Sequence, residues 1–229
     1  MLAAAASVAS ATTTYVATGT AGGVTIDAEA DFTFSNNLLT LTLTNLLAGP
    51  TTVGQNISDF EFTVASLSAT TPTLAPYPQT QAPNLVTITG SGYTVTPTNS
   101  TTGPPGWAFT YSSGDFALNG LAGSTHGPAY TIVGPPGSGY PTNGSLDTGS
   151  HNPFIYQTAT WVFNIIDPAG TSLNITHVNF SFGTTAGDDF SCDVTGNCNT
   201  PEPGSWLLLG TGLLGLVLLT LKSARKTTA

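Results

Sequence analysis

The sequence predicts an all-β body, an antiparallel β-sandwich or jelly-roll-like fold, followed by one carboxyl-terminal transmembrane helix. Apolar and polar residues alternate with period two through much of the body, which is typical of strands with one buried face. No segment before residue 200 shows a sustained 3.6-residue apolar period with good helix formers. The run from Trp206 to Leu221 is apolar and carries no charge. Together these patterns predict a sheet-built body and a membrane-spanning tail.

Each expected strand follows from its own alternation. In the run 24–34 the apolar side chains of Val24, Ile26 and Phe32 alternate with Thr25 and carboxylates. A second run, 39–44, alternates leucine with threonine, and Asn36-Asn37 between the two runs predicts a tight hairpin turn, because asparagine tolerates positive φ. A third run covers 59–64. Later expected strands are Leu85–Thr89, Trp107–Tyr111, Ala129–Val133, Ile155–Ile166 and Ile175–Phe182.

Charge is distributed very unevenly along the chain. Of 229 residues only three are basic, Lys222, Arg225 and Lys226, and the formal net charge is −9. Residues 1–221 therefore contain no lysine or arginine that could bind phosphate backbones, so we expect no nucleic-acid partner. They also offer no lysine for a Schiff base and no arginine to hold an anionic substrate. A polar but weakly charged surface favours an extracytoplasmic domain.

The amino-terminal segment predicts a remnant of a signal peptide, residues 1–11. Ala9-Ser10-Ala11 matches the small-residue pattern of a cleavage site, although a basic region is absent and the apolar stretch is short. The alternative is an alanine-rich segment that leads into the body. We expect the β body to cover residues 12–183.

Two cysteines lie close together in the segment 184–205, which we expect to be a linker. Cys192 and Cys198, without further cysteine or histidine at ligand spacing, favour a disulfide over a zinc site. Such a bridge would contribute on the order of 2 kcal/mol and would indicate an oxidising compartment. The alternative is two reduced thiols in a loop.

We predict no cofactor and no metal site, and carboxylates are the weak candidates for one, with calcium as the ion that oxygen ligands would suit. Asp27, Glu29 and Asp31 project from one face of a strand, and Asp59 and Glu61 would join them if the two strands were neighbours. The alternatives are a glycosidase carboxylate pair and a solvated face that keeps the protein soluble. A second group lies beside the cysteines in the sequence: Asp188, Asp189 and Asp193.

Motifs of common enzymes are absent from the sequence, so we predict no enzymatic activity and no catalytic residue. His126, His151 and His177 lie far apart and are expected to be loop or surface residues. Aromatic residues in or beside loops could stack on sugar rings, or could simply pack within the fold. These are Tyr77, Tyr93, Trp107, Tyr111, Tyr130, Tyr140 and Tyr156.

The tail has the layout of a single membrane span. As a helix, residues 206–221 would extend about 24 Å, a little less than the hydrocarbon core, and Lys222 can reach the interface. The expected anchor residues are Trp206, Leu207, Leu208, Leu209, Leu213, Leu214, Leu216, Val217, Leu218, Leu219 and Leu221. Lys222, Arg225 and Lys226 set the topology and place the tail 222–229 in the cytoplasm. The body then lies outside.

Pro201-Glu202-Pro203, the run WLLLGTGLLGLVLLTL and the basic end KSARK together resemble the PEP-CTERM proteins, which are exosortase substrates of Gram-negative bacteria. The prolines favour an extended backbone, which suits the groove of a processing enzyme. The resemblance covers about 26 residues. It implies a membrane-embedded cysteine transpeptidase as a partner and cleavage near Pro201-Glu202-Pro203. It also implies transient anchoring in the inner membrane, followed by release to the cell surface or extracellular matrix.

Three functions follow as expectations. The first is an exported structural or adhesive protein that associates with exopolysaccharide. The second is a secreted glycan-active hydrolase or carbohydrate-binding module with the same tail. The third is a single-pass protein that stays anchored and is never cleaved.

Overall fold

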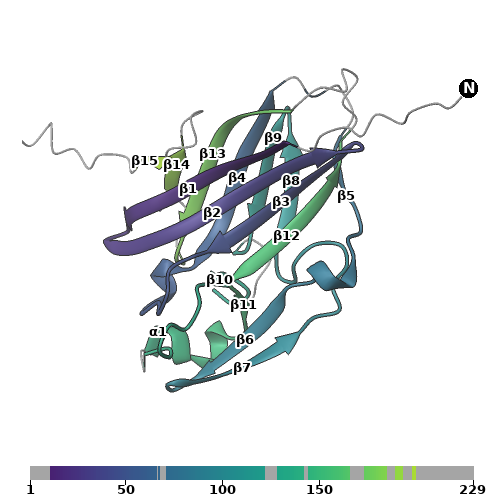
Figure 1. The fold of residues 1–229 in the computed structure, drawn as a ribbon. Helices are drawn as coiled ribbons and strands as arrows, with labels where there is room; N and C mark the ends of the chain where they lie inside the picture. Colours follow the sequence, from purple (N-terminus) through teal and green to yellow (C-terminus); the bar gives the residue numbers. More distant parts are fainter. Residues whose placement is uncertain are drawn as a thin grey trace, which may run out of the picture.

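Two β-sheets make up most of what the computed structural model describes, which is residues 11–65, 67, 71–121, 128–141, 144–165, 173–184, 189–192 and 198–199. The smaller sheet has five strands in the order β1 (Ala11–Ala21), β2 (Val24–Ser35), β3 (Leu38–Asn45), β12 (Thr158–Asn164), β5 (Thr73–Leu74). All of its neighbouring strands pair antiparallel. Figure 1 shows this sheet in front of the strands β4, β9 and β13.

The larger sheet has ten strands. Its main path runs in the order β15 (Cys198–Asn199), β14 (Asp189–Cys192), β13 (Asn174–Phe182), β4 (Ile57–Ala65), β10 (Ile132–Val133), β11 (Phe154–Tyr156), β6 (Asn84–Thr89), β7 (Gly92–Pro97). The other two strands are β9 (Asp115–Asn119), which pairs with β4, and β8 (Ala108–Ser112), which pairs with β9. The sheet branches at β4, because two strands pair with successive parts of it. β10 pairs with β4 at Ile57, and β9 pairs with β4 from Asp59 onward.

Helical structure is sparse, as the sequence predicts. The described residues contain one short α-helix, α1 (Gly144–Asp147), and three 3-10 turns, η1 (Val53–Gln55), η2 (Gln79–Gln81) and η3 (Gly149–His151). The mostly antiparallel β body is therefore confirmed. One pairing departs from the expectation, because β10 and β11 are parallel and the larger sheet is mixed.

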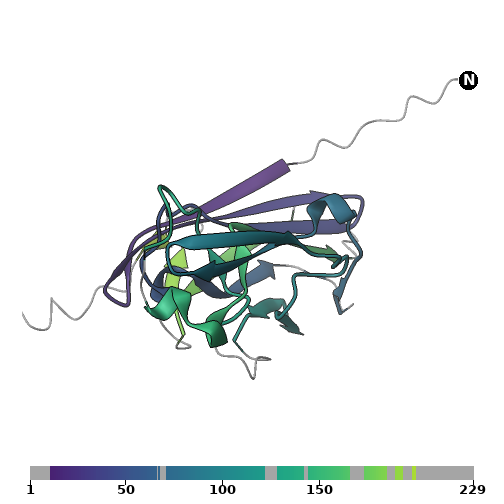
Figure 2. The same cartoon turned by 90° about the horizontal axis from the view of Figure 1, so that it is seen from below.

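The main core lies between the two sheets and is rich in phenylalanine. Phe32 of β2 packs against Phe62 of β4 with ring centroids 5.0 Å apart, and Phe116 of β9 packs against Phe163 of β12 at 5.3 Å. Each fully buried ring contributes about 1.5–3 kcal/mol through burial. Figure 2 shows the purple strands β1–β3 running as one layer along one side of the molecule.

A second, smaller core lies beneath the β6–β7 hairpin and α1, in the lower part of Figure 1. Its buried members are Val53, Val86, Ile88, Val133, Tyr140, Leu146 and Phe154. Buried amides join this region to the sandwich. The Nδ2 of Asn45 donates to the carbonyls of Gln55 and Ile132, at 2.9 and 3.0 Å.

The predicted hairpin at Asn36-Asn37 is confirmed. Both residues have positive φ, 51° and 61°, and Ser35 pairs with Leu38 on either side of them. Two consecutive residues with positive φ form the turn whose twist matches that of the flanking strands.

The expected strand Ile155–Ile166 is in fact two strands, one in each sheet. Gln157, with φ 64°, separates β11 from β12, and its backbone N–H donates to the carbonyl of Val133. The carbonyl of Gln157 in turn accepts from the N–H of Asn45. The chain thus crosses between the sheets at Gln157, and both the N–H and the C=O of this residue have hydrogen-bond partners.

Strands extend beyond both expected ends of the β body, residues 12 and 183. β1 starts at Ala11 and buries Tyr15 and Ala17, so the last residue of the expected signal remnant belongs to the sheet, whereas residues 1–10 lie outside the described part. Within the expected linker 184–205, β14 pairs with β13 and β15 pairs with β14. The hydroxyl of Tyr15 donates to the carbonyl of Ile175 at 2.9 Å and joins β1 to the larger sheet.

Candidate functional site

The outer face of the five-stranded sheet carries the most regular array of polar side chains in the described residues. We call it the hydroxyl–carboxylate face. It consists of Thr12, Thr14, Thr18, Asp27, Glu29, Asp31, Thr33, Thr40, Thr42 and Thr44. These residues share one face because they alternate with buried residues along β1, β2 and β3.

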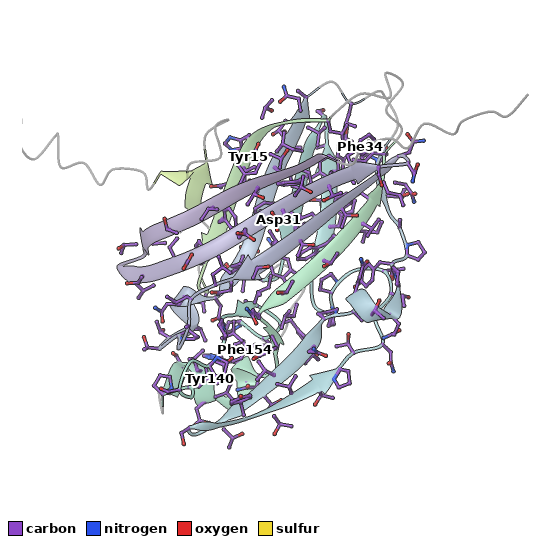
Figure 3. All side chains as sticks on the ribbon, in the orientation of Figure 1. Tyr15, Asp31, Phe34, Tyr140 and Phe154 are labelled. Carbon is purple, nitrogen blue, oxygen red and sulfur yellow. The ribbon has the colours of Figure 1, made fainter. Side chains whose placement is uncertain are left out.

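The strand register aligns these side chains in rows across the sheet. Asp31 lies opposite Thr14 on one side and Thr42 on the other, and Thr42 lies opposite Thr160 of β12. The hydroxyl of Thr14 donates to Oδ1 of Asp31 at 2.5 Å, and the hydroxyls of Thr42 and Thr160 are 3.3 Å apart. Figure 3 shows Asp31 on β2 in the middle of this sheet.

The three carboxylates of β2 repel one another. The pKa of Glu29 is raised above its ordinary value, first by partial burial and then by the charges of Asp31 and Asp27. No lysine or arginine precedes Lys222 in the sequence, so the body supplies no such side chain to offset this charge. The face therefore presents a row of carboxylates to a ligand, flanked by threonine hydroxyls except at Glu29, whose partner on β1 is the exposed Val16.

The two groups of acids that could have formed one patch lie in different sheets. Asp27, Glu29 and Asp31 are in β2, whereas Asp59 and Glu61 are in β4 of the larger sheet, and β4 pairs with β9, β10 and β13. The hypothesis of a shared five-acid patch is therefore wrong. Sequence alone could not have decided this, because it depends on which strands are neighbours.

Within the described ranges, no group of three or more histidine, cysteine or acidic side chains is arranged to hold a metal ion. Asp27, Glu29 and Asp31 therefore do not enclose a calcium site on their own. The other calcium candidates fall elsewhere: Asp188 and Asp193 lie outside the described residues, and Asp189 is the first residue of β14.

The loop aromatics are mostly part of the fold. Tyr77 and Tyr140 are buried, and the hydroxyl of Tyr140 donates to the carbonyl of Gly134 at 2.8 Å. Trp107 is half-buried, and its indole N–H donates to the carbonyl of Tyr130 at 2.8 Å. Tyr111, Tyr130 and Tyr156 are also half-buried. Tyr93 differs from these, with 45% of its surface exposed.

Two histidines lie in separate surroundings and the third, His126, lies outside the described residues. Nδ1 of His151 is 2.6 Å from the carbonyl oxygen of Ser145, beside α1. His177 is exposed on β13, opposite Thr63. Their different elements give no indication of a shared catalytic site.

Cys192 and Cys198 are backbone partners in the ladder between β14 and β15. Directly opposite residues in an antiparallel pair have Cα atoms about 4.5–5.5 Å apart, which lies within the range for a disulfide. The disulfide stays a prediction, and the pairing of the two strands brings these residues close enough for it.

Comparison with protein families finds one match in the carboxyl-terminal region. Residues 199–223 match the family described as the PEP-CTERM protein-sorting motif. The chain carries a PEP-CTERM sorting motif. This motif implies export, transient anchoring in the membrane and processing by an exosortase, which is itself a membrane protein. Pro201, Glu202, Pro203 and the segment 206–226 lie outside the described residues.

Comparisons of the whole chain give one further result. Comparison with curated proteins yields no match. One similar solved structure is the KRT10-binding region domain of the pneumococcal serine-rich repeat protein PsrP, at 14% identity and a TM-score of 0.25. That alignment covers 81% of this chain and 87% of the other. Among the described residues, none of the helices has the length and apolar character needed to cross a membrane.

Proposed function

We propose that this PEP-CTERM protein is an exported, non-catalytic protein of the cell surface or extracellular matrix that binds exopolysaccharide through its hydroxyl–carboxylate face. The observation that carries the proposal is the alignment of threonine hydroxyls and carboxylates in rows on β1, β2 and β3. Sorting by an exosortase would deliver this face to the compartment in which exopolysaccharide is found.

The chemistry of the face suits a hydroxyl-rich polymer. Each threonine hydroxyl can donate one hydrogen bond and accept others, as sugar hydroxyls do. Neighbouring strands repeat these groups about every 4.7–4.9 Å, so an extended polymer can contact several rows at once. Many weak contacts along one polymer add up to a much tighter association than any single contact.

The carboxylates favour an ion-bridged contact with the polymer. Calcium takes 6–8 oxygen ligands, and a single open carboxylate supplies only one or two of them. An ion held by Asp31 or Asp27 would therefore keep most of its coordination sites for water and for oxygens of the polysaccharide. The repulsion that raises the pKa of Glu29 is relieved when such an ion binds.

Cosedimentation of the full chain, in detergent, with exopolysaccharide purified from exosortase-bearing cells tests the proposal. The double variant Asp27→Asn with Asp31→Asn should lose most binding and most of its dependence on millimolar calcium. Glu61→Gln with Asp115→Asn is the matched control, because both residues are exposed on the larger sheet and the net charge changes equally. Equal binding by the two double variants would rule out the face as the binding site.

The hydrolase alternative makes a different prediction. It needs two carboxyl groups that converge on one bond, about 5–9.5 Å apart. Release of reducing ends from the same polysaccharide by the full chain would support the hydrolase and would contradict the non-catalytic proposal.

A further inference from the structure

The last strand of the larger sheet, β7, has one edge that pairs with no described strand, and one of its faces carries Tyr93, whose ring packs edge-on against Tyr140 with centroids 5.5 Å apart. Within the described ranges β7 pairs only with β6, and each of its six residues from Gly92 to Pro97 is exposed. Tyr93 and Val95 are 45% and 38% exposed and are the two most exposed large hydrophobic residues in the described part. Exposed edge strands with apolar side chains are templates for pairing with another chain.

The ladder shows which backbone groups face the open edge. The N–H of Thr98 donates to the carbonyl of Pro83, so this pair, which continues the β6–β7 register, is hydrogen-bonded. Hydrogen-bonded and non-hydrogen-bonded pairs alternate in an antiparallel ladder. The pairs of Val86 with Val95 and of Ile88 with Tyr93 are therefore non-hydrogen-bonded. The N–H and C=O groups of Tyr93 and Val95 consequently point away from β6.

This edge lacks the features that usually prevent pairing between sheets. Natural edge strands are commonly protected by charged side chains, prolines or bulges. β7 has no charged residue, its register with β6 is regular, and its one proline, Pro97, lies at the end of the strand. The surrounding sequence is also uncharged, because no Asp, Glu, Lys, Arg or His occurs between Glu61 and Asp115.

The distribution of charge indicates what kind of partner fits. Acids lie on the strands β2, β4, β9 and β14, and residues 1–221 contain no lysine or arginine, so two copies repel each other where these acids face one another. β7 itself carries no acid, and the carboxylate of Asp147 lies at the β6–β7 turn, where it accepts from the N–H of Gly90 at 2.7 Å. A cationic partner would instead be attracted to the acids of the hydroxyl–carboxylate face. An uncharged, β-branched and aromatic edge on an otherwise anionic body favours a second copy of the same chain.

We propose that β7 is a self-association edge, at which two copies pair their β7 strands antiparallel about a two-fold axis. With Thr94 opposite Thr94 of the second copy, Tyr93 of each copy lies opposite Val95 of the other. This register uses the outward N–H and C=O groups of both residues in four new hydrogen bonds. It also forms two cross-strand pairs between an aromatic and a β-branched side chain, which are favourable on a sheet. The same patch serves both copies, so the pairing closes as a dimer.

The contact is small, because one six-residue strand buries much less than the ~800 Å² per partner of a stable complex. The association is therefore weak in dilute solution and strengthens where copies are concentrated, on a membrane or along a polymer. It is independent of the polysaccharide site, since the hydroxyl–carboxylate face belongs to the other sheet.

The test uses Thr94, the residue on the two-fold axis. It is exposed and pairs with Thr87 of β6, so Thr94→Glu leaves the monomer intact but places two carboxylates opposite each other in the dimer. Thr87→Glu is the matched control, an equal charge on the same face one strand further from the edge. Sedimentation velocity of the full chain in detergent, over a concentration series, measures the dissociation constant.

Thr94→Glu should raise the dissociation constant about tenfold or more, whereas Thr87→Glu should change it much less. Thr94→Lys alone should weaken the dimer similarly, and an equimolar mixture of Thr94→Glu and Thr94→Lys should restore it. A wild-type chain that shows no concentration-dependent association would overturn the proposal. Equal effects of the two glutamate variants, or no recovery in the mixture, would overturn it as well.

Discussion

Replacing Phe62 by alanine tests whether the two sheets share one phenylalanine core. The Phe62 side chain is 1% exposed, and its ring centroid is 4.5 Å from that of Phe116 in the same sheet. It also contacts Phe32 and Phe163 of the other sheet, at 5.0 and 6.1 Å. Removing a buried phenylalanine costs about 3–5 kcal/mol. Because two of the contacts cross between sheets, we expect the upper half of that range, about 4–5 kcal/mol.

Urea unfolding of the full chain in detergent, followed by tryptophan fluorescence, measures the loss. Trp161 is buried and reports on the separation of the sheets. Phe34→Ala is the matched control, because Phe34 lies near the end of β2 and is half-buried. About half of the burial energy of a phenylalanine ring is therefore lost, roughly 0.8–1.5 kcal/mol. If Phe62→Ala costs no more than Phe34→Ala, the packing of the sheets described above is wrong.

Three further predictions concern the turn, the buried tyrosines and the carboxylate row. Asn37→Val should destabilise the chain by about 1–2 kcal/mol in urea, and Asn37→Gly should not, because φ at this position is 61°. Burial raises the pKa of Tyr140 above its ordinary value. The unfolded tyrosine therefore loses its proton first, and stability should fall as pH rises above about 10, with a shallower fall in Tyr140→Phe. Glu29→Gln should raise the Tm at low salt near pH 7, and this gain should shrink in high salt, since it relieves repulsion from Asp31 and Asp27. A gain that does not depend on salt would contradict that cause.

Local sequence patterns predicted the elements whose two faces differ. β2 and β3 alternate large apolar and polar side chains, and the turn between them needs two residues that tolerate positive φ. The sorting motif was predicted for the same reason, because its parts are contiguous in the sequence and its family match covers residues 199–223.

Two of the strands that the sequence analysis did not predict, β7 and β1, show that local contrast only weakly. β7 alternates only two large apolar residues, Tyr93 and Val95, with threonine, and this run is short. β1 alternates threonine mainly with alanine and glycine, whose small side chains give little apolar contrast. The break at Gln157 depends on carbonyl and N–H partners at Asn45 and Val133, far away in the sequence.

The candidate site was predicted in part. The alternation that places Asp27, Glu29 and Asp31 on one face is local, and the structure has it. Their threonine neighbours on β1 and β3, and their separation from Asp59 and Glu61, follow from strand order, which is set by contacts distant in sequence. The open edge at β7 likewise exists only because β6 and β7 end the larger sheet.

The intact mass of the protein recovered from exosortase-bearing cells, compared with that from otherwise identical cells without exosortase, tests the central claim most directly. Export and sorting through the PEP-CTERM motif predict that the mature protein ends near Pro201-Glu202-Pro203, without the apolar run Trp206–Leu221. Cells without the enzyme should keep the chain through Ala229. A chain that retains Ala229 in both kinds of cell would contradict the claim and would instead indicate a permanent anchor.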